Sequence, residues 1–178
     1  RRLLYGWGVC MVRILRLLVV VMLAFGLASC GMRGKKKPPA KEIEIKPAPQ
    51  NAGLDFLVAA SPLVNPQPDG QPSPTVVRVY LLSGDTAFAN ASFRQLWEND
   101  AKTLGPTMLG KAELIVQPGS VAHVKAPMTE GTVLVAVVVG FRDFQDAKWR
   151  AMIPLQGEKQ LKLKADLKSL SVDLGPQD

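Results

Sequence analysis

Short apolar runs alternate with turn-forming residues from about residue 52 onward, which is the pattern of a mainly β domain. In residues 160–167, apolar side chains recur at every second position, as in a strand with one buried face. Residues 132–141 are almost wholly apolar, so we expect a central strand that is buried on both faces. The predicted strands are residues 54–60, 75–82, 112–116, 121–126, 132–141, 148–154 and 160–167, with a last short strand after a bulge or turn near residues 168–169.

The sequence Gln-Pro-Gly-Ser at residues 117–120 separates two of these strands. Proline and glycine in the middle of such a segment favour a tight turn. We therefore predict that residues 112–116 and 121–126 form a β-hairpin.

One segment breaks the β pattern. Ser92 and Gln95 have the spacing of a capping box, and apolar residues then recur at helical intervals until Gly105 and Pro106. We predict a helical insertion at about residues 92–104. Its apolar stripe is expected to pack on the sandwich, the alternative being that the stripe binds a partner.

Residues 61–74 form a long connection between the first two strands. Its five prolines stiffen the chain and prevent it from pairing in a sheet: Pro62, Pro66, Pro68, Pro72 and Pro74. A loop of this length is usually functional or disordered. Its prolines favour a functional loop, because a stiff loop loses less entropy on binding. Leu63 and Val64 are its candidate apolar contacts.

The front of the chain has the composition of a secretory signal peptide at residues 1–29, with translation expected to start at Met11. Arg13 and Arg16 precede an apolar stretch, and small residues follow it. This stretch is shorter than the roughly 20 apolar residues that a membrane-spanning helix needs. A transmembrane anchor is therefore the less favoured alternative.

The segment Leu27-Ala28-Ser29-Cys30 resembles the bacterial lipobox, after which Cys30 becomes the acylated first residue. More than one acyl chain is needed for stable anchoring, and the three chains of a mature lipoprotein satisfy this condition. Gly31 and Met32 bring no acidic residue behind the cysteine, which favours the outer membrane. We expect no cofactor, only the covalent acyl chains on Cys30.

Residues 30–51 are rich in lysine and proline and poor in large apolar residues. Such a segment cannot form a core, so we predict a lipidated cysteine followed by a flexible tether.

The net charge of +7 raises the possibility of nucleic-acid binding. The excess of positive residues lies before residue 47, whereas residues 47–178 carry 12 Lys and Arg against 13 Asp and Glu. A nucleic-acid-binding domain carries its basic patch on the fold itself. We therefore predict no nucleic-acid partner.

Few residues offer catalytic or metal chemistry. Cys10 and Cys30 both lie in the front segment, which leaves the domain without a disulfide, a thiolate or a cysteine-ligated metal. His123 is the only histidine and is expected at the surface of a strand. Asp143 and Asp146 alone are too few to hold calcium. We predict neither an enzyme nor a binder of a small-molecule substrate.

Several segments together resemble the TssJ lipoprotein family of the type VI secretion system. They are the lipobox, residues 65–74 leading into 76–82, Phe88 with the helix at residues 93–104, and Gly140-Phe141-Arg142-Asp143 followed by Trp149-Arg150. The resemblance implies a transthyretin-like β-sandwich with a small helical insertion, here at residues 52–178. It also implies a lipoprotein on the periplasmic face of the outer membrane that holds the periplasmic part of the IcmF-like inner-membrane subunit TssM.

In that family the loop between the first two strands is a contact surface. Carried over to this chain, the predicted partner-binding residues are Ser61, Pro62, Leu63, Val64, Asn65, Pro66, Gln67, Pro68, Asp69, Gly70, Gln71, Pro72, Ser73 and Pro74.

Other interpretations stay open. Arg142, Asp143, Trp149 and Arg150 are either a functional patch or, as we favour, a structural group that stabilises the sheet edge by cation-aromatic packing. A pilot or assembly lipoprotein of another envelope machine is the alternative function. A lipid-anchored glycan-binding or hydrolytic domain is weaker, because it requires surface aromatics in a groove or paired acids.

Overall fold

The computed structural model describes residues 53–157 and 160–177. The predicted signal peptide, the lipidated Cys30 and the tether at residues 30–51 lie outside these ranges. Within the described ranges, no helix combines the length and the hydropathy needed to cross a membrane.

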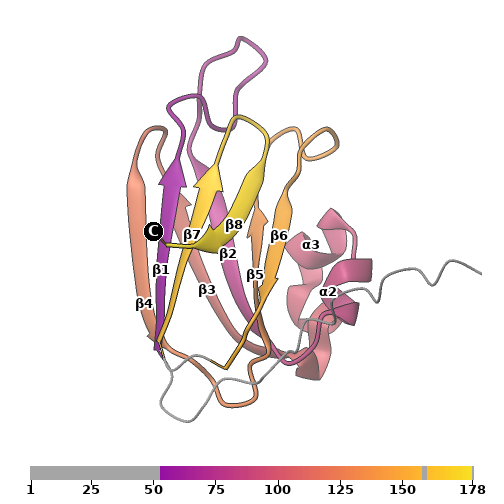
Figure 1. Cartoon of the computed structure of the whole chain (residues 1–178). Helices are drawn as coiled ribbons and strands as arrows, with labels where there is room; N and C mark the ends of the chain where they lie inside the picture. Colours follow the sequence, from indigo (N-terminus) through magenta and orange to yellow (C-terminus); the bar gives the residue numbers. More distant parts are fainter. Residues whose placement is uncertain (1–52, 158–159, 178) are drawn as a thin grey trace, which may run out of the picture. The chain divides into compact units, whose positions relative to one another are not determined.

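Two four-stranded sheets pack face to face (Figure 1). The first has the order β4-β1-β7-β8, and its strands are β1 (Gly53–Ala60), β4 (Val121–Pro127), β7 (Gln160–Leu167) and β8 (Val172–Pro176). The second has the order β3-β2-β5-β6, and its strands are β2 (Thr75–Leu82), β3 (Met108–Val116), β5 (Leu134–Val139) and β6 (Arg150–Pro154). All neighbouring strands are antiparallel except β1 and β7.

The core between the sheets follows from the two-residue period of the strands. Alternate residues of β1 are buried, so that Phe56 and Val58 face the other sheet while Asp55 and Leu57 do not. Leu163 and Ala165 of the neighbouring β7 are buried in the same way. These side chains form one continuous apolar cluster with the inward residues of β2 and β5.

All six residues of β5 are buried, as the valine-rich sequence predicts. Val135, Val137 and Val139 belong to the core between the sheets. Ala136 and Val138 belong to a second core that the helical insertion covers. The insertion therefore supplies the second apolar environment that this strand requires.

The helical insertion predicted at about residues 92–104 is confirmed as α3 (Phe93–Leu104). α2 (Thr86–Asn90) precedes it, and the short 3-10 helix η1 (Gly105–Thr107) follows it. Ser92 and Gln95 form the expected capping box. Leu96 and Leu104 are buried against the sheet, which confirms that the apolar stripe packs on the sandwich. The five-residue α2 was not predicted.

The predicted hairpin between residues 112–116 and 121–126 is wrong, because β3 and β4 belong to different sheets. Leu114 and Val124 approach the same core from opposite sides. The turn at residues 117–120 therefore carries the chain across the edge of the sandwich. The turn is closed by its own hydrogen bonds, such as the one from Ser120 Oγ to Gln117 O at 2.8 Å. Such bonds are compatible both with a hairpin and with a connection between two sheets.

Four connections meet at one end of the sandwich, which we call the loop end: β1–β2, β3–β4, β5–β6 and β7–β8. β1, whose first residue is Gly53, starts at the opposite end (Figure 1).

Candidate partner-binding loop

The connection between β1 and β2 has a buried base and an exposed tip. Val64, Asn65 and Ser73 are buried, whereas the residues from Gln67 to Gln71 are exposed. The base anchors the loop in the domain, and the tip is the part that a partner can reach.

Asn65 organises the base. Its Nδ2 donates to Pro74 O at 3.0 Å, and its Oδ1 accepts from the backbone N–H of Arg142 at 2.8 Å. Its own backbone N–H donates to Ser169 O at 2.9 Å, and its carbonyl accepts from Ser73 Oγ at 2.6 Å. One residue thus joins the loop to the β5–β6 connection, to the β7–β8 turn and to its own returning arm.

The backbone of Asn65 has a φ of 50°. Asparagine is one of the few residues that adopts this left-handed conformation with little strain. Asn65 therefore satisfies a backbone requirement as well as a side-chain requirement. The sequence signal for it was its position before Pro66, because Asn-Pro is a turn signal.

The tip is a closed turn. Gln67 N donates to Gln71 O at 2.8 Å, and Gly70 N donates to Gln67 O at 2.8 Å. Gln71 N also donates to Asp69 Oδ1 at 3.0 Å. Gly70 has a φ of 83°, which a residue with a side chain rarely adopts. The backbone of the tip is therefore fixed by its own hydrogen bonds and by its prolines.

The two candidate apolar contacts of the loop differ in position. Leu63 is 65 % exposed, whereas Val64 is fully buried in the core. Val64 N donates to Ser61 O, and Leu63 N donates to Ser61 Oγ. Ser61 thus begins a turn in which Leu63 faces outward and Val64 faces the core. Leu63 is available to a partner, and Val64 supports the loop from below.

Ion pairs surround the neighbouring β7–β8 turn. Lys148 Nζ and Lys168 Nζ lie 2.6 Å and 2.9 Å from the two carboxylate oxygens of Asp173. The hydrogen bond from Lys148 and then the one from Lys168 lower the pKa of Asp173 to about 2. This part of the loop end carries several charges, whereas Asp69 is the one charged residue among residues 61–74.

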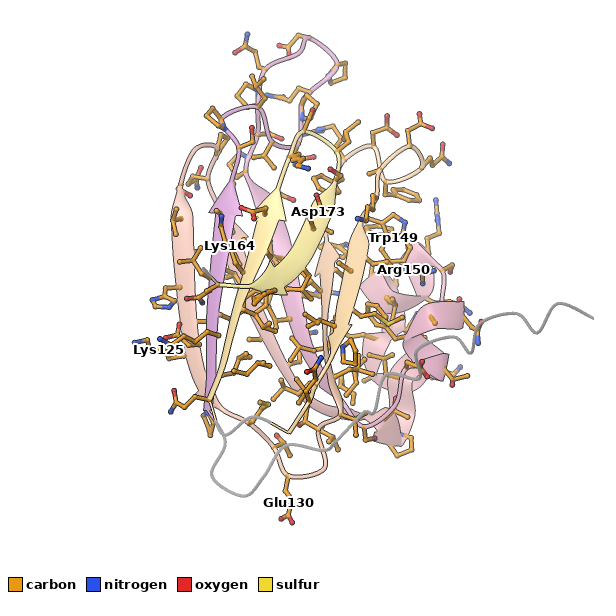
Figure 2. All side chains as sticks on the ribbon, viewed as in Figure 1. Lys125, Glu130, Trp149, Arg150, Lys164 and Asp173 are labelled. Atoms are coloured by element: carbon orange, nitrogen blue, oxygen red, sulfur yellow. The ribbon has the colours of Figure 1, made fainter. Side chains whose placement is uncertain are left out.

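The patch at Arg142, Asp143, Trp149 and Arg150 divides into two parts. The Arg150 guanidinium lies 4.8 Å from the centre of the Trp149 ring and donates to Phe88 O and Ala91 O, which fixes α2 against β6 (Figure 2). The structural interpretation of this pair is confirmed. Arg142 and Asp143 are exposed in the β5–β6 connection, and Arg142 supports the loop through its backbone N–H.

His123 lies exposed on β4 beside Asp55 of β1, as expected for a surface histidine. Its contact with Asp55 is the largest cause of a lowered Asp55 pKa. Among the residues that the structure describes, no three His, Cys, Asp or Glu side chains are grouped so that they could hold a metal ion.

Comparison with known proteins identifies the family. The family model described as "Type VI secretion lipoprotein, VasD, EvfM, TssJ, VC_A0113" matches residues 52–170. No match was found among curated proteins.

Solved structures share the fold. TssJ1 from Pseudomonas aeruginosa is 26% identical, with a TM-score of 0.68 over 72% of this chain and 98% of that chain. Lip from Serratia marcescens, a membrane-bound component of the type VI secretion system, is 19% identical, with a TM-score of 0.66 over 72% and 99% of the two chains. A chain in the structure described as "T6SS protein TssM C-terminal domain (869-1107) from EAEC" is 20% identical, with a TM-score of 0.59 over 70% and 98%.

The family model covers the sandwich up to the β7–β8 turn. The solved structures confirm the predicted fold class. The chain belongs to the type VI secretion lipoprotein family, whose members are structural components of the secretion system and not enzymes.

Proposed function

We propose that acyl chains on Cys30 anchor this lipoprotein to the periplasmic face of the outer membrane. In this proposal, its β1–β2 loop binds the periplasmic domain of the IcmF-like inner-membrane subunit TssM. The protein would thereby tie the membrane complex of the secretion system to the outer membrane.

The observation that carries the proposal is a prestructured loop at the end of the domain opposite to Gly53. The chain from Cys30 enters the domain at Gly53, and β1 then runs for eight residues before the loop begins. At about 3.3 Å per residue, β1 separates the two ends by roughly 26 Å. A domain held at one end can therefore present the loop away from the membrane.

The construction of the loop suits protein recognition. Hydrogen bonds of Asn65, Asp69 and Gly70 hold its backbone in place before any partner arrives. Binding by a prestructured loop avoids much of the entropy cost of ordering it. The exposed tip offers the side-chain amides of Gln67 and Gln71 and the carboxylate of Asp69, which are hydrogen-bonding groups suited to protein recognition.

Two further observations support the anchor and the partner. The lipobox ends at Cys30, and no acidic residue follows at Gly31 or Met32. A chain with this fold is present in a solved structure whose description names the TssM C-terminal domain.

Calorimetric titration tests the proposal. The full lipidated protein, purified in detergent, is titrated with the periplasmic domain of the TssM subunit of the same secretion system. A variant in which residues 66–72 are replaced by a glycine-serine linker of equal length keeps Asn65 and Ser73 in the base. We expect the wild type to bind and this variant to bind at least about 100-fold more weakly, in line with the loss of several central contacts.

Circular dichroism and thermal unfolding show whether the variant remains folded. Binding that survives the replacement would move the interface away from the loop tip. No binding by the folded wild type would contradict the proposed partner and favour an assembly lipoprotein of another envelope machine.

A further inference from the structure

Two uncharged stretches of the sequence meet at the loop end. Residues 56–68 and residues 114–122 contain no Asp, Glu, Lys, Arg or His, in a chain of which 21% is charged. The first stretch leads into the β1–β2 loop, and the second contains the β3–β4 turn.

The two stretches are in direct contact. Gly119 N donates to Ser61 O at 3.2 Å, and Ala60 N donates to Ser120 O at 2.9 Å. A Cβ atom built on Gly119 would lie 3.7 Å from Pro62 Cγ, so the turn packs against the first residues of the loop. The β3–β4 turn therefore continues the surface of the loop.

Exposed apolar side chains lie in the loop and on both sides of the β3–β4 turn. Of the described residues, the large hydrophobic side chains that are exposed are Leu63, Ile115 and Val121, at 65 %, 67 % and 63 %, and Met152 at 44 %. Three of these four flank the contact between the loop and the β3–β4 turn. Ile115 and Val121 project from the outer faces of the two sheets, one on each side of the turn. We name the group formed by Pro62, Leu63, Ile115, Pro118 and Val121, which spans the turn and both its flanks, the apolar crest.

The rest of the loop end differs in character. The β5–β6 connection carries Arg142, Asp143, Asp146 and Lys148, the β7–β8 turn carries Lys168, and Asp173 lies at the start of β8. Single exposed hydrophobic residues are common on protein surfaces and need no explanation. Depletion of charge together with exposed apolar side chains is the compositional mark of the centre of a protein interface.

We propose that the apolar crest is the second half of the partner-binding surface, so that the partner contacts the β3–β4 turn together with the β1–β2 loop. The inference rests on the proposed function and assigns the crest to the same TssM-type periplasmic domain, because the crest is continuous with the loop that binds it. The matching surface of the partner is apolar and free of charge.

Substitutions outside the loop test this inference. Ile115→Asp and Val121→Asp, singly and together in the full lipidated protein, place a charge in the crest and leave residues 61–74 unchanged. The second pair, Ile115→Thr and Val121→Thr, retains β-branching for strand stability. Met152→Asp and Met152→Thr are matched controls at the exposed apolar residue outside the crest.

We expect each crest aspartate to weaken binding of the TssM periplasmic domain by about tenfold or more, since burying an unpaired charge is costly. The threonine variants should weaken binding less, and the Met152 variants should change it less than about twofold, because exposed positions outside an interface contribute little. The loss should be mainly a faster dissociation rate in surface plasmon resonance.

The outcomes separate this inference from the proposed function. If the crest variants bind like the wild type while replacement of residues 66–72 abolishes binding, the crest is not part of the interface and the proposed function stands. If the wild type itself does not bind, both proposals fail. If the variants bind normally but convert a self-associated wild type into monomers in analytical ultracentrifugation, the crest contacts a second copy of the chain and the inference is overturned.

Discussion

At the scale of single residues, Asn65 determines the conformation of the β1–β2 loop. Its side chain and backbone make four hydrogen bonds to three segments of chain, and its φ of 50° excludes most other residues. The family resemblance predicts that Asn65 is one of fourteen loop residues that contact the partner. The structure gives it a supporting role beneath the tip, and partner contact by the exposed tip stays a prediction.

Asn65→Ala should lower the free energy of unfolding by about 1–3 kcal/mol, since it removes two part-buried hydrogen bonds that each contribute roughly 0.5–1.5 kcal/mol and leaves their backbone partners unpaired. The unpaired groups are the N–H of Arg142 and the carbonyl of Pro74. Hydrogen exchange of the loop amides should accelerate. Asn65→Gly loses the same bonds but tolerates the backbone, so it should be less destabilising than Asn65→Ala. The exposed Asn90→Ala serves as a control, and equal stability of all variants in urea denaturation would contradict this role.

At the scale of elements, the sequence predicts what depends on local pattern. The strand at residues 75–82 and the helix that begins after Ser92 were predicted because alternation and capping are encoded within a few residues. The hairpin at residues 117–120 was predicted wrongly because the choice of strand partner depends on distant residues. β1 lies between β4 and β7, and no local signal in residues 112–126 indicates this arrangement.

The same limit applies to the candidate site. Length and proline content predict that residues 61–74 are a functional loop, but they do not separate Leu63 from Val64. That separation depends on the turn at Ser61 and on core packing, which are tertiary features. The bonds from Asn65 to Arg142 and Ser169 cross 77 and 104 positions of sequence, which is beyond the reach of motif analysis.

The helical insertion is joined to the sheet through a close approach at Gly140. A Cβ atom at this position would lie 2.4 Å from Trp97 Cη2, so a side chain there must displace the indole ring. Trp97 also stacks on Phe93 and lies beneath the Arg78 guanidinium, 4.2 Å from the ring centre. The ring thus has little room to move.

Gly140→Ala should therefore lower the free energy of unfolding by about 1–3 kcal/mol, the usual cost of overpacking. The emission spectrum of the tryptophans should also change, because the indole of Trp97 moves. Gly84→Ala is the matched control, since a Cβ atom there meets nothing within 4 Å. If the two variants have the same stability in chemical denaturation, the contact between Gly140 and Trp97 does not hold the insertion in place.

At the scale of the whole molecule, the two ends of the sandwich have different tasks in the proposed function. The chain from Cys30 enters at Gly53, and the loop and the apolar crest lie at the opposite end. The strands between them share one core, and β1 and β7 pair over all eight residues of each strand. In the proposed function, the folded domain therefore lies between the predicted flexible tether and the partner-binding end.

Several ionised carboxylates stabilise the folded domain, and we expect this stabilisation to be lost in acid. Contact with His123 lowers the pKa of Asp55. Burial alone would raise the pKa of Asp100, but hydrogen bonds from Lys111 and Tyr80 lower it overall. Each of these groups favours the folded state when it is ionised, and that contribution decreases as it becomes protonated.

Asp173 permits a specific test, because its pKa of about 2 in the folded protein lies below the ordinary value of 3.8. Its contribution to stability is complete above pH of about 4 and is lost as the pH falls to about 2. Asp173→Asn should therefore reduce stability at pH 6 by less than about 1 kcal/mol, as expected for an exposed ion pair, and should make the decline between pH 4 and pH 2 less steep. Urea denaturation across this pH range measures both effects, with the exposed Asp143→Asn as control. A parallel decline in wild type and Asp173→Asn would show that the contacts of Asp173 with Lys148 and Lys168 do not contribute to the stability of the folded protein.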